Sequence, residues 1–160
     1  MLAVMYTWTT YGTWLRGDDR GWVENGITYP PSYQIEQHDR ALLKHEPWFF
    51  DETQFLKIGN LVGRSLIDRR KLSIYALAVQ SWHLHIVTSV IDHNWSATVK
   101  CAKDAVRWGL RPGRPIWTDG FDKRFCFDDK SMWNRIEYVQ RHNVALGWKA
   151  DPWDFLVSPP

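Results

Sequence analysis

Two apolar segments that nearly touch in the sequence constrain the fold most strongly. Residues 72–80 (LSIYALAVQ) and 82–91 (WHLHIVTSVI) are both rich in β-branched and aromatic residues, which favour strands. A single residue separates them, and strands this close in sequence pair as an antiparallel hairpin. The chain is therefore expected to contain an antiparallel sheet.

Helical patterns lie on both sides of this hairpin. Before it, Asp51 and Gln54 form a capping-box pattern, and apolar residues then recur at helical spacing to about residue 68. After it, Asn94 is suited to cap a helix that the breaker RPGRP, at residues 111–115, brings to an end. Each helix presents an apolar stripe that can cover the sheet.

The remaining segments complete the order of elements. Strands are expected at residues 2–10 and within 116–127, a short helix at 34–45, and a last helix from residue 128 or 129 to about 144. Without the short helix, the order is strand, helix, strand, strand, helix, strand, helix. It predicts an α+β fold with a ferredoxin-like or RRM-like antiparallel sheet and helices on one face, to which the C-terminal helix is an addition.

Length and composition indicate one globular domain. The chain has 160 residues, of which 44% are hydrophobic and 24% charged, and this excludes a disordered chain. We expect residues 1–150 to form a single domain with an irregular, Gly- and Pro-containing insertion at 16–50, and residues 151–160 to form a C-terminal tail.

The sequence also indicates where in the cell the protein is expected. No apolar run approaches the roughly 20 residues of a membrane span, and the N-terminus lacks the features of a signal peptide. Two cysteines, Cys101 and Cys126, make no disulfide framework. A reducing cytoplasm is the expected location.

Positive charge is concentrated in the middle of the chain. The net charge is only +2, but residues 57–114 carry ten basic and three acidic side chains. Four of the basic residues form a stripe on one predicted helix: Lys100, Lys103, Arg107 and Arg111. Such a band can meet a polyanion, and a solvated helix surface is the alternative interpretation.

A histidine pair lies on the second strand of the hairpin. His83 and His85 are two residues apart, so both imidazoles leave the same face of the strand while Leu84 points to the other. Neutral imidazoles that share a face are natural ligands for a divalent metal. An exposed pair of strand histidines without a metal is the alternative.

The last helix carries a second group of polar residues. Its buried face is expected to consist of Met132, Ile136, Val139 and Asn143. Tyr138 and His142 are four residues apart and share one flank, with Arg135 three residues before the tyrosine. His142 can complete a three-ligand site, Tyr138 can attack a phosphorus beside it, and Arg135 can hold a phosphate oxygen. The alternatives are a packed tyrosine with a solvated hydroxyl and a histidine that interacts with the helix dipole.

Together these residues resemble the single-tyrosine HUH transposase superfamily, which includes IS200-like and REP-associated tyrosine transposases. The HUH motif (histidine, hydrophobic residue, histidine) is His83-Leu84-His85, and Tyr138 and His142 match the nucleophile and the third metal ligand. The stretches EYVQRHNVALGW and TWTTYGTWLRGDDRGWV also resemble family segments. His142 departs from the family pattern, which usually has Asn or Gln at this position.

The resemblance implies cleavage and strand transfer of single-stranded DNA, either in transposition or in a host role. Tyr138 would form a 5′-phosphotyrosine intermediate, and Mg²⁺ or Mn²⁺ would be held by His83, His85 and His142. The implied partners are single-stranded or hairpin DNA and a second copy of the chain in a homodimer, at the nucleoid in the cytoplasm. The candidates for DNA contacts are Arg135, Lys100, Lys103, Arg107, Arg111, Arg69, Arg70 and Lys71.

Two other functions remain open on the sequence alone. A non-catalytic RRM-like module would bind single-stranded nucleic acid through aromatic residues on its strands. It would not need the histidine pair or the flank shared by Tyr138 and His142. A metal-dependent phosphoesterase that uses water would need the histidines but not Tyr138.

Overall fold

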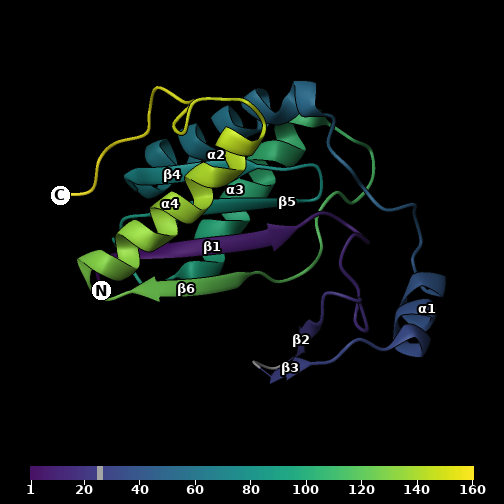
Figure 1. Cartoon of the computed structure of the whole chain (residues 1–160). Coiled ribbons are helices and arrows are strands. Elements are labelled where there is room, and N and C mark those ends of the chain that lie inside the picture. The colour runs from purple at the N-terminus through teal and green to yellow at the C-terminus, as the bar shows by residue number, and fades with distance from the viewer. Residues whose placement is uncertain (25–26) are drawn as a thin grey trace.

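The computed structural model of the chain describes residues 1–24 and 27–160, and its main element is an antiparallel sheet (Figure 1). Asn25 and Gly26, within the segment expected to be irregular, lie outside the described residues. In the described part, four strands lie in the order β4 (Ile74–Val79), β5 (His83–Thr88), β1 (Ala3–Thr9) and β6 (Asp122–Cys126). Helices connect β1 to β4 and β5 to β6, so the predicted ferredoxin-like arrangement is confirmed.

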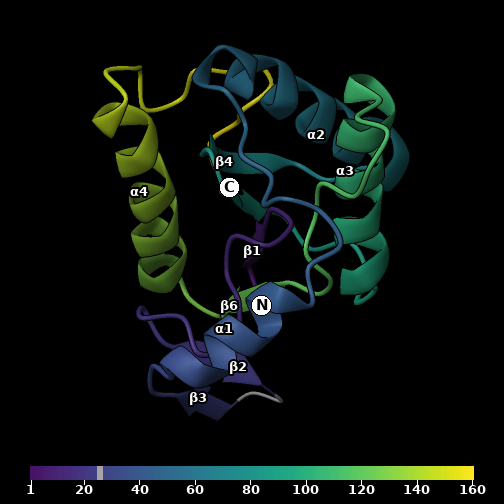
Figure 2. The ribbon, with the colours of Figure 1, turned by 90° about the vertical axis from the view of Figure 1, so that its right-hand side faces the viewer.

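Helices cover both faces of this sheet (Figure 2). One face packs against α2 (Phe55–Arg70) and α3 (Trp95–Leu110), and the other packs against α4 (Asp129–Ala145). Along β1, Val4 and Tyr6 point to the first core and Met5 to the second, as alternation along a strand requires. The prediction of helices on one face holds for α2 and α3, whereas the additional helix α4 lies on the opposite face.

The packing of α4 follows the predicted stripe. All four of its predicted core residues are buried: Met132, Ile136, Val139 and Asn143. The Nδ2 atom of Asn143 donates hydrogen bonds to the carbonyl oxygens of Leu77, at 2.9 Å, and Ala150, at 2.8 Å. A buried amide with two such partners joins α4 to β4 and to the chain beyond the helix.

Several boundaries differ from the prediction by a few residues. The capping box of Asp51 and Gln54 is present at η1 (Glu52–Gln54), but α2 continues to Arg70, beyond the predicted end near residue 68. The predicted strand within 116–127 is confined to β6. The residues before Asp122 form a connection that contacts the end of β1 through the Thr10–Trp117 bridge and a hydrogen bond from the Thr118 amide to the Thr9 carbonyl oxygen, at 3.1 Å, without continuing as a strand. No helix in the described ranges combines the length and apolar character that crossing a membrane requires.

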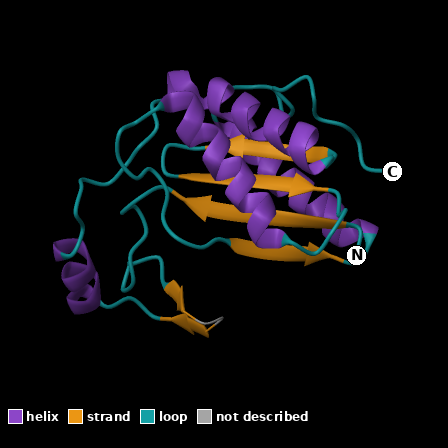
Figure 3. Ribbon diagram, turned by 180° about the vertical axis from the view of Figure 1, so that it is seen from behind, coloured by secondary structure: helices purple, strands orange, loops and turns teal. Residues whose placement is uncertain are grey.

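The segment 16–50 is more ordered than the sequence indicated. It contains a short hairpin of β2 (Trp22–Glu24) and β3 (Ile27–Tyr29), followed by α1 (Tyr33–Ala41), and it projects beyond the end of β1 (Figures 1 and 3). The rings of Trp22 and Tyr29 stack across the hairpin, with centroids 4.5 Å apart. Three-residue strands show too little alternation to be recognised in a sequence, so the sequence does not predict this pair of strands.

Residues 151–160, expected to form a tail, contribute to the core. Trp153 and Phe155 are buried against α2, where Gly59 and Gly63 provide the space. A Cβ atom at Gly59 would lie 2.2 Å from Trp153, and one at Gly63 would lie 2.1 Å from Phe155. The indole nitrogen of Trp153 donates to the carbonyl oxygen of Leu56 at 3.1 Å. Two glycines four residues apart thus form a groove for these aromatic rings.

Loss of this packing should destabilise the whole protein. Trp153→Ala removes a buried indole and leaves a cavity beside α2, so we expect the free energy of unfolding to fall by about 3 kcal/mol. Urea unfolding followed by circular dichroism measures the change. Val157→Ala is the control, because Val157 is exposed and its truncation should cost less than about 0.5 kcal/mol. Equal stability of the two variants would contradict the packing described.

Candidate active site

Three histidines converge on the face of the sheet covered by α4. His83 and His85 project from β5, and His142 projects from the last turn of α4. One ligand nitrogen from each residue lies within 4.8 Å of the other two. The ring centroids of His85 are 4.6 Å from His83 and 4.9 Å from His142. Two elements far apart in sequence therefore bring the three predicted ligands together.

Tyr138 lies at the edge of this cluster. It precedes His142 by one helical turn, and its ring centroid is 5.3 Å from that of His85 and 5.0 Å from that of His142. The side chain remains 41% exposed, so a substrate can reach the phenol. Arg135 lies half-buried one turn further toward the start of α4. The shared flank predicted from the spacing is thus next to the histidine pair.

A contact from β1 orients one of the two strand histidines. Thr7 lies opposite His85 in the β1–β5 pair, and its hydroxyl shares a 2.7 Å hydrogen bond with His85 Nδ1. This bond leaves Nε2 of His85 for another partner. His83 Nδ1 is buried and has no hydrogen-bond partner among the described residues. A buried polar atom without a partner is costly unless a ligand satisfies it.

An aromatic wall that the sequence analysis did not identify borders His83. The ring of Trp82 lies 4.0 Å from that of His83, centroid to centroid, and 5.8 Å from Trp14. The Arg20 guanidinium lies over both indoles, 4.4 Å from Trp82 and 4.9 Å from Trp14. Asp18 holds Arg20 through two charge-assisted hydrogen bonds, at 2.7 and 2.6 Å. The sequence signal for this wall is limited to the tryptophan-containing segment near the N-terminus. The contact of Trp14 and Arg20 with Trp82 depends on tertiary packing, which a sequence pattern does not specify.

Burial keeps the three imidazoles neutral. Desolvation, with the charges of His142 and Arg20, lowers the pKa of His83 to about 4. Desolvation, with the charges of His83 and His142, lowers the pKa of His85 to about 2. Burial also lowers the pKa of His142. Near neutral pH all three therefore present nitrogen lone pairs, and with the unpartnered nitrogen of His83 this donor set can hold a metal ion.

The predicted basic stripe lies elsewhere. Three of its residues, Lys100, Lys103 and Arg107, belong to α3, and Arg111 directly follows it. Helix α3 lies on the face of the sheet opposite α4 (Figure 2), and therefore opposite the histidines. The Lys103 ammonium is used within the protein, where it donates to the carbonyl oxygens of Thr118, at 2.8 Å, and Gly120, at 2.7 Å. At the end of α2, Arg70 is paired with Asp92, whereas Arg69 and Lys71 are exposed.

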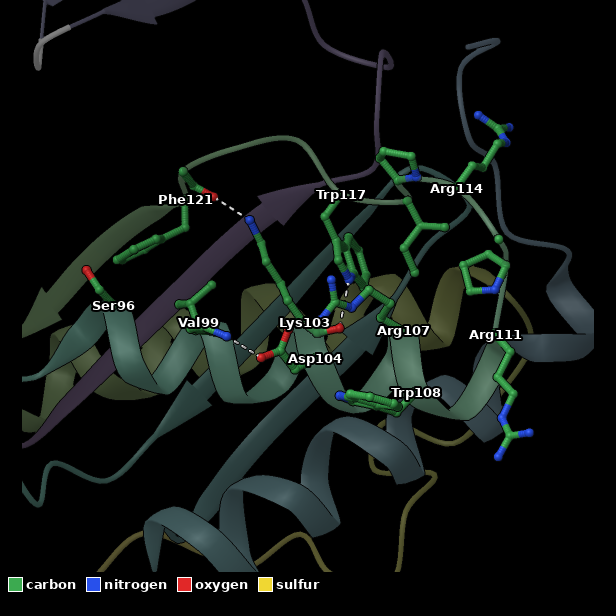
Figure 4. A pocket seen from close by; sticks show the side chains of 16 residues that line it. Ser96, Val99, Lys103, Asp104, Arg107, Trp108, Arg111, Arg114, Trp117 and Phe121 are labelled. Atoms are coloured by element: carbon green, nitrogen blue, oxygen red, sulfur yellow. Dashed lines mark hydrogen bonds and ion pairs between the residues drawn. The ribbon is translucent and has the colours of Figure 1, made fainter. Parts of the chain in front are cut away.

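A groove of about 1030 Å³ runs along this stripe, between α3 and residues 111–121 (Figure 4). Its lining includes Lys100, Arg107 and Arg111, and the acidic residue in its described lining is Asp104. Trp108 lies at the groove with 70% of its surface exposed. An open, cationic groove with an exposed indole has the features of a surface for single-stranded nucleic acid.

Comparisons with known proteins identify the fold but no closer relationship. No family model matches this sequence, and no curated protein matches it. The structure is similar to a solved structure of a REP-associated tyrosine transposase bound to a REP hairpin, with a TM-score of 0.59 and 14% sequence identity. The similarity covers 96% of this chain and 74% of that one. The chain therefore has the fold of this transposase.

Acid should destabilise the metal-free protein through its buried histidines. The folded-state pKa values of His83 and His85 are about 4 and about 2, whereas an unfolded histidine titrates near about 6.5. From about pH 6.5 down to about pH 4 the unfolded chain binds more protons, so stability is lost as the pH falls through this window. Each histidine contributes up to about 1.4 kcal/mol per pH unit.

Urea unfolding in the presence of a chelator, repeated across this pH window, measures the effect. His83→Gln should flatten the dependence on pH, because the glutamine does not titrate. His38→Gln, at an exposed position on α1, should leave it unchanged. An identical slope for the parent protein and His83→Gln would show that His83 is not neutral and buried as described.

Proposed function

We propose that this chain is a transposase-type nuclease that cleaves and rejoins single-stranded DNA through a covalent link to Tyr138. The observation that carries the proposal is the accessible phenol of Tyr138 beside the His83, His85 and His142 cluster. A non-catalytic binding module has no need of this arrangement. The transposase fold of the chain supports the same conclusion.

The proposed chemistry is an in-line displacement at phosphorus. Tyr138 Oη loses its proton and forms a bond to phosphorus, while the bond from phosphorus to the 3′ oxygen breaks. The products are a 5′-phosphotyrosine and a 3′-hydroxyl that has gained a proton. In strand transfer, a 3′-hydroxyl attacks the phosphotyrosine and releases the phenol. Mg²⁺ or Mn²⁺ held by the three histidines would polarise the phosphoryl oxygens.

Arg135 is proposed to bind a non-bridging phosphate oxygen. It lies on α4 one turn before Tyr138 and is half-buried. A guanidinium can form two parallel hydrogen bonds to phosphate, which fixes the direction of the strand as well as its position. This contact would align the scissile phosphate with Tyr138 Oη.

The proposed partner is single-stranded or hairpin DNA. The structural neighbour is described as bound to a REP hairpin. We further propose that residues 1–150 act as one domain, whose core residues 151–160 help to fill. The exposed cations of the groove on α3 hold the DNA backbone outside the active site. One chain brings Tyr138 and all three histidines together, so a homodimer would duplicate the site rather than complete it. Work on DNA would place the protein at the nucleoid.

Removal of one oxygen tests the nucleophile. Tyr138→Phe keeps the ring but has no Oη, so we expect no covalent adduct with a labelled hairpin oligonucleotide on a denaturing gel. Tyr33→Phe is the matched control. Tyr33 is exposed on α1, so this variant should form the adduct like the parent protein. Adduct formation by Tyr138→Phe at the parental rate would show that another residue is the nucleophile. Hydrolysis by the parent without any adduct would instead indicate a water-dependent phosphoesterase.

The salt dependence of DNA binding tests whether the groove on α3 contacts the DNA backbone. Arg107→Gln with Arg111→Gln removes two exposed cations, so the slope of log affinity against log salt should become shallower by about 1.4 for a single strand. Fluorescence anisotropy with a labelled oligonucleotide measures both slopes. Arg40→Gln with Lys57→Gln makes the same change in charge at exposed positions outside the groove and should leave the slope unchanged. Equal slopes for both double variants would exclude the groove as a DNA contact.

A further inference from the structure

The protein supplies only imidazole nitrogens to its candidate metal site. The cluster consists of His83, His85 and His142, and no aspartate or glutamate of the described residues belongs to it. All three rings come from rigid elements, two from β5 and one from α4. The composition of this donor set limits which ions can be held.

Among the described residues, the contacts of the cluster add no negative charge to the site. The charged group nearest to His83 along the aromatic wall is the Arg20 guanidinium, which lies 4.4 Å from the centre of the Trp82 ring. The Asp18 carboxylate is turned toward Arg20 and accepts its hydrogen bonds. On the other side, the oxygen in contact with the cluster is the neutral Thr7 hydroxyl at His85 Nδ1.

Magnesium fits such a site poorly. Mg²⁺ requires near-octahedral oxygen coordination and is usually held by one or two carboxylates. Imidazole nitrogens suit zinc, copper, iron and nickel, and affinity for nitrogen sites rises from Mn²⁺ through Co²⁺ to Cu²⁺. A set of three histidines with an open position is also a known catalytic arrangement for zinc.

We infer that the three-histidine cluster is a transition-metal site that selects ions such as Mn²⁺, Co²⁺ and Zn²⁺ over Mg²⁺. This deepens the proposed function, because it concerns the same residues and decides between the two ions proposed there. His142 is the residue that determines the selectivity, since it supplies the third nitrogen. An amide at this position offers a harder oxygen ligand instead.

Metal binding to the full-length, chelator-stripped protein tests the inference without any DNA. Titration calorimetry should give one Co²⁺ or Zn²⁺ per chain, bound at least about 100-fold more tightly than Mg²⁺, with Mn²⁺ between them. Bound Co²⁺ should also give the visible absorption of a nitrogen-coordinated site. Mg²⁺ binding with one ion per chain as tightly as Co²⁺ would overturn the inference.

Two variants test whether His142 determines the selectivity for Co²⁺ over Mg²⁺. His142→Gln should weaken Co²⁺ binding by at least about 10-fold and reduce the ratio of Co²⁺ to Mg²⁺ affinity, because one nitrogen ligand becomes an oxygen. His93→Gln is the matched control: His93 is exposed, stacks on Trp95 and lies outside the cluster, so both affinities should be unchanged. Equal Co²⁺ affinities for the two variants would contradict the role given to His142.

The adduct assay separates this inference from the proposed function. Adduct formation with Mg²⁺, together with equal binding of Mg²⁺ and Co²⁺, would leave the nuclease proposal intact and overturn the selectivity. Tight one-to-one Co²⁺ binding that depends on His142, without an adduct in the presence of any ion, would support the selectivity and overturn the nuclease proposal.

Discussion

The packing of α4 on the sheet determines whether a site exists at all. Met132, Ile136 and Val139 are buried against the strands, and Asn143 joins the helix to β4 through the Leu77 carbonyl. These contacts fix the rotation of α4 about its axis. Because Tyr138 and His142 lie on the flank beside this buried stripe, the same rotation places them next to His85. A different rotation would separate the ligands without altering any residue of the cluster.

Local periodicity made much of this site predictable. Alternation along β5 gave the shared face of His83 and His85, and helical spacing gave the shared flank of Tyr138 and His142. Both patterns lie within single elements, so they need no knowledge of the rest of the fold. The buried stripe on α4 then indicated which flank lies beside the sheet. These three pieces of local information converge on one surface.

Features that depend on contacts between elements were not predictable in this way. The hydrogen bond of Thr7 to His85 requires the register of β1 against β5, which no pattern in either strand specifies. The wall of Trp14, Arg20 and Trp82 depends on how the segment before β2 folds back toward β5. The spacing of the basic stripe predicts that it shares one face of a helix, and the stripe lies on α3, but the face of the sheet on which α3 packs follows from topology. Its cations therefore lie away from the histidines.

The groove at the two glycines of α2 bears on the order in which the core can form during synthesis of the chain. A growing chain contains both strand histidines and the open groove at Gly59 and Gly63 long before it contains Trp153 and Phe155. The Ala150 carbonyl that accepts from Asn143 also comes after α4. One of the two hydrogen bonds of the Asn143 amide, beside His142, thus forms only when the chain beyond α4 is in place. A chain synthesised only as far as β5 would present two histidines on a strand without the third, so the three-histidine cluster can assemble only once the C-terminal part of the core has been made.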